Sequence, residues 1–398
     1  MMEFQGYLRA DGTVGTRNYT VVLPTIDCAN AMAKKIADGV VGAIPMLHNH
    51  ACIRVGEDRR IGQETVIGIG KNPNVGAVLV VGIGCEPMCA QPIVDEIQKT
   101  GKPVDFVSID KEGDYDTLIA TGIAKLQELK AKADAFTREP CDVGKLIISI
   151  KCSASGTMSL ISNNPVVGAA MDLLVQHGGT AIFSETAEIL GAQQILKDKS
   201  VSEEVKKKID AVSADMLRKI ADAGVDILGS EPNQGNIQNG LTTIEEKSLG
   251  AVSKSGTTPL QDVLQYGEAP KGTGVYFMDG SSTSAPLFLG GFMVGSQVGI
   301  FTMGGGLPAR FRGLPSHSSG FHALPTLKVL GSPAEVDVKD DFDIYTGSVI
   351  TGEESIQELG RKLFEKIIAV AGGEEPVNEQ VVGDYQEMLQ VYAIGLLM

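Results

Sequence analysis

The chain has 398 residues and a formal net charge of −15 at pH 7, with 43% hydrophobic and 21% charged residues. This length exceeds the usual size of one hydrophobic core, so we expect two or three domains in a globular protein. A phosphate backbone repels so acidic a chain, which argues against nucleic acid as a partner. No leader pattern and no apolar run of about 18 residues is visible, so we expect a cytoplasmic protein that does not enter a membrane.

The first third of the chain alternates strand patterns with helical patterns. Short apolar runs predict strands at 19–26, 42–47, 75–84 and 104–110. Helical patterns separate these strands, and a long amphipathic helix is predicted at 115–136. This β-α-β-α order predicts a parallel sheet with helices on both faces, in a doubly wound N-terminal domain at 1–138.

The rest of the chain repeats the same order in further units. Strands are predicted within 145–153, 180–186, 272–282 and 294–306. A loop is predicted at 230–250, and the weakly patterned tail after Glu375 is expected to pack on a partner. We therefore expect the α/β fold class throughout, with a larger C-terminal α/β region at 139–398 that can divide into subdomains at 139–270 and 271–398.

Reactive or polar side chains follow many of the predicted strands at the point where each strand ends. They are Cys28, Cys85, Cys152, Glu185 and Asp279. In parallel α/β sheets the carboxyl ends of the strands form the ligand-binding edge. We therefore expect a functional site there.

The stretch MLHNHACIRVGED at 46–58 contains two of the five histidines and one of the six cysteines. His48 and Cys52 are ligand types that suit iron, zinc or copper. The alternative is a loop histidine beside a buried thiol, the commonest fate of a free cysteine. His50 is expected to face solvent or to support a neighbouring ligand.

Two charged side chains are further candidates for catalysis. Glu185, in SETAE, is placed to act as a metal ligand or a general base, or merely as an acid favoured at a helix N-terminus. Lys247, in EEKSLG, is a candidate catalytic amine, with an ion pair to Glu246 as the alternative. Together with His48 they form the predicted catalytic set.

Polar loops offer groups that can bind an anionic substrate. The serines of KCSASGTMS enter a predicted helix, where backbone N–H groups favour anions. The candidates are Arg17, Ser153, Ser155, Ser159, Asn233 and Asn236. The glycine-rich stretches GIGKNPNVG and TMGGG do not fit the dinucleotide fingerprint, so no NAD is predicted.

Long motifs spread over most of the chain carry a family resemblance. They are GYLRADGTVGTRNYTVVLPT, NPNVGAVLVVGIGCE, IKCSASG, SNNPVVGAAMDLL, SETAEILGA and PNQGNIQNGLTTIEEKSLGAVSKSGTTPLQDVLQYGE. With them the chain resembles the altronate/galactarate dehydratase family, which includes the large subunit of sulfolactate sulfo-lyase. The resemblance implies a metal-dependent carbon–oxygen lyase that removes water from a sugar acid or related 2-hydroxy acid to give a 2-keto acid. The alternatives are a carbon–sulfur lyase that releases sulfite from sulfolactate, and a non-catalytic binding protein for acidic sugars.

The resemblance also implies cofactors and partners. Members of the family use a divalent metal, usually iron or manganese, and a small domain that is fused or carried on a separate subunit. This chain starts directly at GYLRADGTVGTRN. We therefore expect a large subunit that needs a small one and assembles as an oligomer.

The expected ligand set is Cys52, Cys85, Cys152 and His48. It allows a mononuclear iron site, which the resemblance favours, or a three-cysteine iron–sulfur cluster with an open iron. Cys89 is expected to be structural, and Cys28 either a site residue or mere packing.

The sequence departs from the sugar-acid dehydratases at three places. Gly156 stands where they have an aspartate, and Gln193 where they have a glutamate. A short turn of theirs is expanded here into GGGLPARFRGLPSHSSGFHALPTLK. Its basic residues, Arg310, Arg312, His317 and His322, are expected to set substrate specificity if the loop is a lid.

Overall fold

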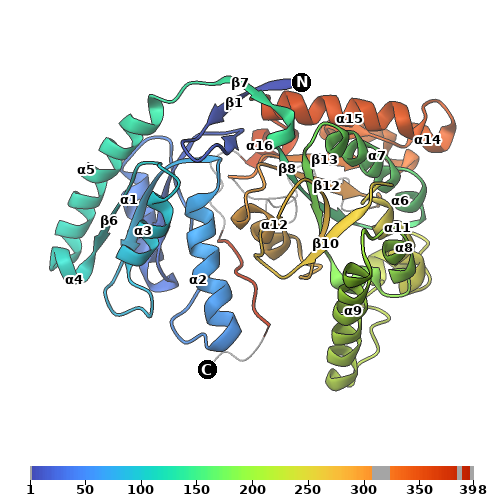
Figure 1. Cartoon of the computed structure of the whole chain (residues 1–398), viewed down its shortest axis with the longest axis horizontal. Helices are drawn as coiled ribbons and strands as arrows, with labels where there is room; N and C mark the ends of the chain where they lie inside the picture. Colours follow the sequence, from blue (N-terminus) through green and yellow to red (C-terminus); the bar gives the residue numbers. More distant parts are fainter. Residues whose placement is uncertain (1, 307–322, 383–387, 395–398) are drawn as a thin grey trace.

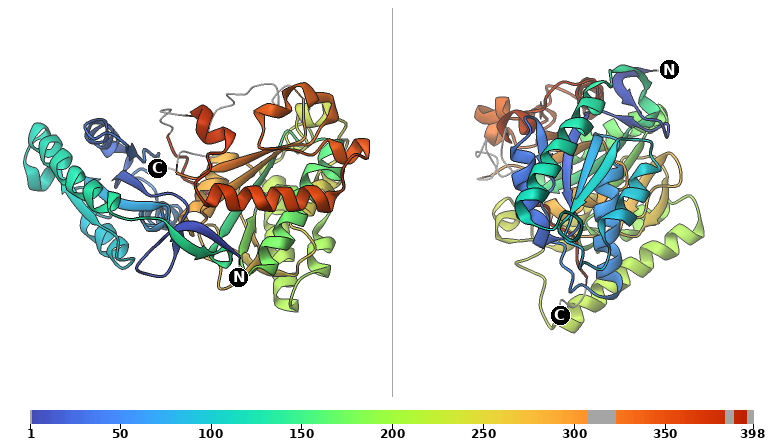
Figure 2. Two further views of the ribbon diagram at one scale, coloured as in Figure 1. Left: turned by 90° about the horizontal axis from the view of Figure 1, so that it is seen from above. Right: turned by 90° about the vertical axis from the view of Figure 1, so that its left-hand side faces the viewer.

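The structure is a computed structural model that describes residues 2–306, 323–382 and 388–394. Two parallel sheets, each flanked by helices, form two lobes that lie side by side (Figures 1 and 2). The predicted α/β fold class is confirmed. The sheet nearer the N-terminus is called the first sheet, and the other the second sheet.

The first sheet has four parallel strands in the order β4-β3-β5-β6. Its strands are β3 (Tyr19–Pro24), β4 (Ala43–Pro45), β5 (Val75–Gly82) and β6 (Val104–Ser108). Every residue of β5 is buried, as its continuous apolar run predicts. The helices are α1 (Asn30–Asp38), α2 (Gly56–Lys71), α3 (Ala90–Gln98), α4 (Ile109–Glu112) and α5 (Tyr115–Asp134).

Helices cover both faces of the first sheet, as the doubly wound arrangement requires. Leu79 faces α1 and α5, in the same core as Ile36 and Leu126. Its neighbour Val80 faces the opposite side, in the core that α2 and α3 help to form. Because successive strand residues point to opposite faces, one apolar run supplies both cores.

The second sheet has seven parallel strands in the order β10-β11-β9-β8-β12-β13-β14. They are β8 (Ile147–Ser153), β9 (Thr180–Phe183), β10 (Leu260–Leu264), β11 (Gly274–Met278), β12 (Val298–Met303), β13 (Thr326–Leu330) and β14 (Ile344–Tyr345). Strands from both 139–270 and 271–398 therefore belong to one sheet. Helix α12 (Ser284–Met293) lies on the face toward α2, while α7 (Asn163–Gln176) and α15 (Ile356–Ala371) lie on the other face (Figure 1).

Shorter and peripheral helices complete this lobe. They are α6 (Thr157–Ile161), α8 (Gln193–Asp198), α9 (Glu203–Ala223), α10 (Gln234–Gln238), α11 (Ile244–Ser253), α14 (Ser348–Thr351) and α16 (Val377–Val382). In the described residues the 3-10 helices are η1 (Asp27–Ala29), η2 (Val143–Lys145), η3 (Thr186–Ile189) and η5 (Pro333–Asp341). The region predicted as a loop at 230–250 thus contains α10 and α11, so that prediction was wrong. Asn233 and Thr243 begin these helices as N-caps.

An antiparallel ribbon joins the two lobes. It consists of β1 (Glu3–Leu8), β2 (Val14–Gly15) and β7 (Glu139–Asp142). The predicted boundary between 138 and 139 therefore lies at the start of a strand, β7, which pairs with β1 at the start of the chain. Cys141, which received no predicted role, is buried in this ribbon.

The described part of the tail packs against this chain. The backbone N–H of Leu389 donates to the carbonyl of Leu47 at 2.7 Å. The N–H of Val391 donates to Oδ1 of Asn49 at 2.8 Å. The tail thus lies along the carboxyl end of the first sheet, between the two lobes (Figure 1).

One described helical stretch, Thr157–Gln176, has the length and apolarity of a membrane span, and 56% of it is buried inside the protein. It consists of α6 and α7, which Ser162 separates. Such burial is typical of a core helix in a soluble protein.

Candidate active site

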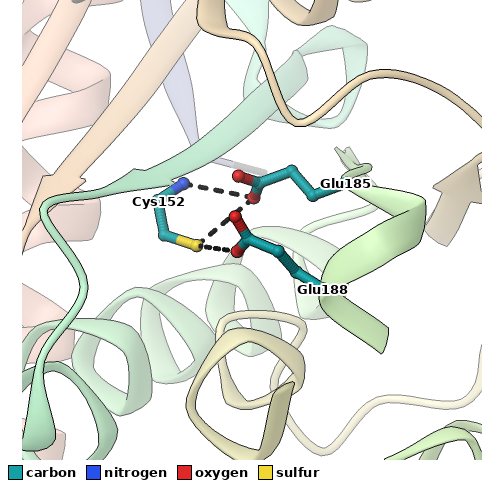
Figure 3. A group of neighbouring side chains, drawn as sticks. All are labelled: Cys152, Glu185 and Glu188. Atoms are coloured by element: carbon teal, nitrogen blue, oxygen red, sulfur yellow. Dashed lines mark hydrogen bonds between the residues drawn. The ribbon is translucent and has the colours of Figure 1, made fainter. Parts of the chain in front are cut away.

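Two neighbouring strands of the second sheet deliver a thiol and a carboxylate to the same edge. Cys152 lies near the end of β8, and Glu185 follows β9 by two residues. The strands are parallel partners, with Ile150 opposite Phe183, so their carboxyl ends lie together. Glu188, on η3, turns back toward both (Figure 3).

Cys152, Glu185 and Glu188 form a compact buried group, called here the Cys–Glu–Glu group. The Cys152 thiol donates to Oε2 of Glu188 at 3.0 Å and to Oε2 of Glu185 at 3.3 Å (Figure 3). One ligand atom from each residue lies within 4.8 Å of the other two. None of the three residues is more than 2% exposed. Such a sulfur and oxygen donor set can hold a divalent metal ion.

Three lysines surround this group. Lys151 and Lys254 both form ion pairs with Glu185. Lys254 also donates to the sulfur of Cys152 at 3.1 Å. Lys247 lies 3.1 Å from Oε1 of Glu188 and pairs with Glu231 as well. Three ammonium groups thus face three carboxylates, and the charges balance while the thiol is neutral.

Burial and neighbouring charges fix the protonation states of the group. Burial raises the pKa of the Cys152 thiol, and the two carboxylates raise it further. Burial opposes ionisation of Glu188, but Lys247 and Lys151 outweigh it and, with Lys254, lower the pKa of Glu188 to about 2. Burial alone would lower the pKa of Lys254, yet Cys152 and Glu185 raise it above its ordinary value. Such a concentration of shifted pKa values is characteristic of functional sites.

The backbone beside the group is strained. In the described ranges, Ala154 and Glu185 are the only non-glycine residues with positive φ, at 44° and 82°. Each costs of order 1–3 kcal/mol, and such residues cluster at active sites. With this backbone conformation, the carboxylate of Glu185 contacts Lys254 and Cys152.

Glu231 marks the outer end of this network. Its side chain is 22% exposed, whereas that of Lys247 is 5% exposed and that of Glu188 is 3% exposed. Burial and the nearby Glu188 raise the pKa of Glu231. Acidic and basic groups therefore run continuously from near the surface to the Cys–Glu–Glu group.

The serines and asparagines predicted to bind an anionic substrate lie next to this site. Several of their polar groups already form hydrogen bonds with other protein groups. Oγ of Ser159 accepts from the N–H of Gly156 at 3.1 Å. Nδ2 of Asn236 donates to the carbonyl of Ser155 at 3.0 Å. Asn233 is exposed and exchanges hydrogen bonds with Asn236 as a helix cap. Ser153 is half-buried beside Cys152.

Arg17 lies away from the second-sheet edge. Its guanidinium donates to Glu379 at 2.6 Å and to the carbonyls of Val370 and Glu374 at 2.9 and 2.8 Å. It also binds the carbonyl of Thr16. These bonds hold the N-terminal segment against the C-terminal helices.

His48 is also occupied by the protein. Its Nε2 lies 2.8 Å from the carbonyl of Pro24, and its Nδ1 accepts from the N–H of His50 at 3.2 Å. Burial lowers the pKa of His48 to about 4, so the ring is neutral. Both ring nitrogens of His48 therefore contact the protein backbone.

The structure divides the predicted ligand set between the two sheets. Cys52 and Cys85 are exposed in loops of the first sheet, whereas Cys152 is buried at the edge of the second. Within the described residues, the one candidate metal group contains Cys152 with Glu185 and Glu188, and neither Cys52 nor Cys85 belongs to it. The expected convergence of all three cysteines is therefore not seen.

Three important groups were given no role from sequence: Lys151, Lys254 and Glu231. One signal for Lys254 was available, because it follows Lys247 by seven residues. Residues seven apart share a helix face, and Lys254 is the C-cap of α11. No local pattern indicates Lys151 or Glu231. The expanded-loop residues Arg310, Arg312, His317 and His322 lie outside the described residues.

Buried acid, amine and thiol groups at the carboxyl edge of a parallel sheet define an α/β enzyme site. Comparison with known families agrees. Residues 143–394 match the domain described as D-galactarate/Altronate dehydratase, C-terminal. Residues 6–134 match the domain described as D-galactarate dehydratase/Altronate hydrolase, second domain. The chain belongs to the galactarate/altronate dehydratase family, which confirms the predicted family.

Relatives align with nearly all of the chain. The (2R)-sulfolactate sulfo-lyase subunit beta of Chromohalobacter salexigens is 35% identical over 390 residues, which cover 97% of this chain and 96% of that protein. The altronate dehydratase of Escherichia coli is 30% identical over 414 residues, which cover 100% of this chain and 79% of that protein. The galactarate dehydratase (L-threo-forming) of Escherichia coli is 31% identical over 283 residues, or 69% of this chain and 51% of that protein. All three relatives are named as lyases.

Proposed function

We propose that the chain is the large subunit of a lyase that eliminates water from a sugar acid or related 2-hydroxy acid, giving a 2-keto acid. The observation that carries this proposal is the Cys–Glu–Glu group with its three lysines at the sheet edge. The names of the relatives support the reaction class. Elimination beside a carboxylate builds negative charge on that carboxylate, and buried ammonium groups stabilise such charge.

Cys152, Glu185 and Glu188 would hold a divalent cation, for which iron or manganese are our candidates. Such an ion, when bound, polarises the carboxylate and hydroxyl of a hydroxy acid. The donor spacing fits this role, but the lysines compete for the same atoms. Since a thiolate is the binding form, Cys152 must lose its proton when it becomes a ligand.

Lys254 is the residue that we assign as general base, and Glu185 as the group that positions it. A cation held by Cys152 and Glu185 would occupy the two acceptors that Lys254 now uses. A buried ammonium group without acceptors gives up its proton readily. The neutral amine can then take the α-proton of the substrate. Lys247 holds Glu188 and links it to Glu231 near the surface.

The second candidate reaction is release of sulfite from sulfolactate. The specific observation that favours it is the match to 96% of the sulfo-lyase subunit. The same residues serve both reactions, but sulfite is the better leaving group and needs less help from an acid. The third possibility, an acidic-sugar binding protein, predicts ligand binding without turnover.

We also propose a small partner subunit, within an oligomer, and a cytoplasmic location. The relative that matches over almost its full length is named as a subunit, which supports a partner. Free thiols persist in the reducing cytoplasm, and the described residues hold six free cysteines.

The function is tested with chain purified without oxygen and loaded with Fe²⁺ or Mn²⁺, with and without a candidate small subunit. Altronate, galactarate and (2R)-sulfolactate are offered in turn, and 2-keto acid and sulfite are measured. Keto acid without sulfite supports the dehydratase, and keto acid with sulfite supports the sulfo-lyase. Binding of an acid with no product under every condition would contradict a catalytic role.

A further inference from the structure

A groove opens on the face of the second sheet that carries α7 and α15, away from α12. Residues of these two helices line it, together with the turn that follows α11 (Figure 1). Its volume is about 600 Å³, and small-molecule sites have about 300–1,000 Å³. The described lining contains none of the residues of the Cys–Glu–Glu group or its three lysines.

The groove combines a half-buried apolar surface with exposed polar side chains. Leu173 of α7 and Ile356 of α15 are half-buried and pack against the core of this lobe. Gln176 and Gln357, on the same two helices, are exposed. An apolar lining with a few polar groups is typical of sites that bind small organic molecules.

Arg361 gives the groove an unpaired positive charge. Among the ion pairs of the described residues, none includes Arg361, whereas the next residue on α15, Lys362, pairs with Glu354. The acid in the lining, Asp172, already accepts from the backbone N–H of Thr257 at 2.9 Å and from its hydroxyl at 2.7 Å. The guanidinium of Arg361 is therefore available to an anionic ligand.

The turn at this groove also carries the amine that we assign as base. Ser253 and Gly256 line the groove, and Lys254 lies between them in the chain. Helix α7 packs directly on this turn, because a Cβ atom at Gly168 would lie only 2.4 Å from the carbonyl oxygen of Ser253. The side chain of Lys254 reaches the sulfur of Cys152 at 3.1 Å. The groove and the Cys–Glu–Glu group thus share one turn of the backbone.

We propose that this groove is an effector site for a small organic anion with an apolar body. The acidic group of the ligand pairs with Arg361, and its body covers Leu173 and Ile356. Because the ligand binds the turn in the position seen here, it favours that position and holds Lys254 beside Cys152. The binding site is independent of the proposed lyase function, whereas the effect on catalysis rests on it.

Two fluorescent probes separate the anionic group from the apolar body. 8-Anilinonaphthalene-1-sulfonate carries a sulfonate, and N-phenyl-1-naphthylamine has the same rings without it. We expect the full chain to bind about one sulfonate probe, and Arg361→Gln to weaken this binding about five- to tenfold. The same variant should leave the affinity for the uncharged probe within about twofold. Lys362→Gln is the matched control on α15, outside the groove, and should keep both affinities.

A second variant and a second readout test the groove and its link to the turn. Leu173→Asn should weaken the binding of both probes, because it makes the apolar surface polar. The bound sulfonate probe should slow hydrogen exchange of the backbone amides at 253–258 in the wild type. In the metal-loaded chain with its small subunit, saturating probe should change kcat by about twofold or more. Neither effect should occur in Arg361→Gln at the same probe concentration.

Thermal unfolding without probe shows whether each variant folds. Equal affinity of the wild type and folded Arg361→Gln for the sulfonate would overturn the anion site, as would an equal loss in Lys362→Gln. Unchanged exchange at 253–258 with probe bound would overturn the link to Lys254, and an unchanged kcat would overturn the effect on catalysis. Probe binding and slower exchange in a chain without lyase activity would support the site and count against the proposed function alone.

Discussion

Nζ of Lys254 lies 3.1 Å from the sulfur of Cys152, although the two residues are 102 positions apart in the chain. One comes from the end of α11 and the other from the end of β8. Their contact joins the amine that we assign as base to the thiol that we assign as ligand. The proposed chemistry depends on this pair and on the carboxylates beside it.

Lys254→Met should lower turnover by about 100-fold or more, because a general base contributes that much. Lys199→Met is the matched control, since Nζ of Lys199 binds the carbonyls of Ser255 and Gly256 close to Lys254 but outside the Cys–Glu–Glu group. The control should lose stability and keep its kcat. Rates are compared at saturating substrate with thermal unfolding of both proteins. A Lys254→Met enzyme as fast as the control would remove Lys254 from the mechanism.

Glu188→Gln should destabilise the fold by roughly 3–5 kcal/mol, because it removes one of the two carboxylates that neutralise the buried ammonium group of Lys247. Lys247 then keeps only Glu231. The double variant with Lys247→Met should recover part of this loss, since neither charge remains. Urea unfolding of the two single variants and the double variant measures the coupling. Additive effects would show that the pair does not interact.

Acid should destabilise the wild type through Glu188 between about pH 4.5 and pH 2. The pKa of this carboxyl is about 2 in the folded protein, below its ordinary value of 4.5. The stabilisation is therefore complete above pH 4.5 and is lost as the pH falls toward 2. Unfolding of wild type and Glu188→Gln across this range should converge at low pH. A constant difference between them would contradict the assigned ionisation.

His48 should add a second acid-sensitive contribution, at higher pH. Its folded pKa is about 4 against an ordinary value of 6.5, because burial disfavours the charged ring. The unfolded chain takes up a proton first, so stability is complete above pH 6.5 and falls toward pH 4. The full loss is roughly 3 kcal/mol. In His48→Asn, the fall in unfolding free energy between these pH values should be smaller. If the unfolding free energy of His48→Asn falls as much as that of the wild type over this pH range, other groups cause the loss of stability.

Arg17→Met should weaken the fold by roughly 2–4 kcal/mol and leave KM unchanged in the protein that remains folded. The reason is that Arg17 binds Glu379 and backbone carbonyls rather than the site. Arg17→Lys keeps the charge but cannot make the same fork of bonds. Its free energy of unfolding should therefore lie between those of the wild type and Arg17→Met. A large rise in KM without loss of stability would restore Arg17 as a substrate ligand.

The four strands of the first sheet and four of the seven strands of the second followed from the sequence, because apolar runs and helical periods are local, whereas β10, β13, β14 and the order of the strands in each sheet were not predicted. The edge placement of Cys152 and Glu185 also followed, since the ends of parallel strands share one side. What local patterns cannot show is which strands share a sheet. Cys85 and Cys152 both end strands, yet those strands belong to different sheets.

Lys254 shows a second limit of prediction from the sequence. Its role depends on α11 packing against η3, and that contact joins segments that no periodicity connects. His48 shows a third, because its type and spacing suit a metal, while the carbonyl of Pro24 occupies its Nε2. Ligand type is visible in a sequence, whereas the partner that a side chain has already taken is not.

The most direct test measures 2-keto acid formation by the metal-loaded protein, with its small subunit, for wild type and Cys152→Ser. The account predicts product from a 2-hydroxy acid with the wild type and a rate about 100-fold lower with Cys152→Ser, whose sulfur no longer serves as ligand. Equal rates for the two proteins would contradict the assignment of this buried group as the lyase centre.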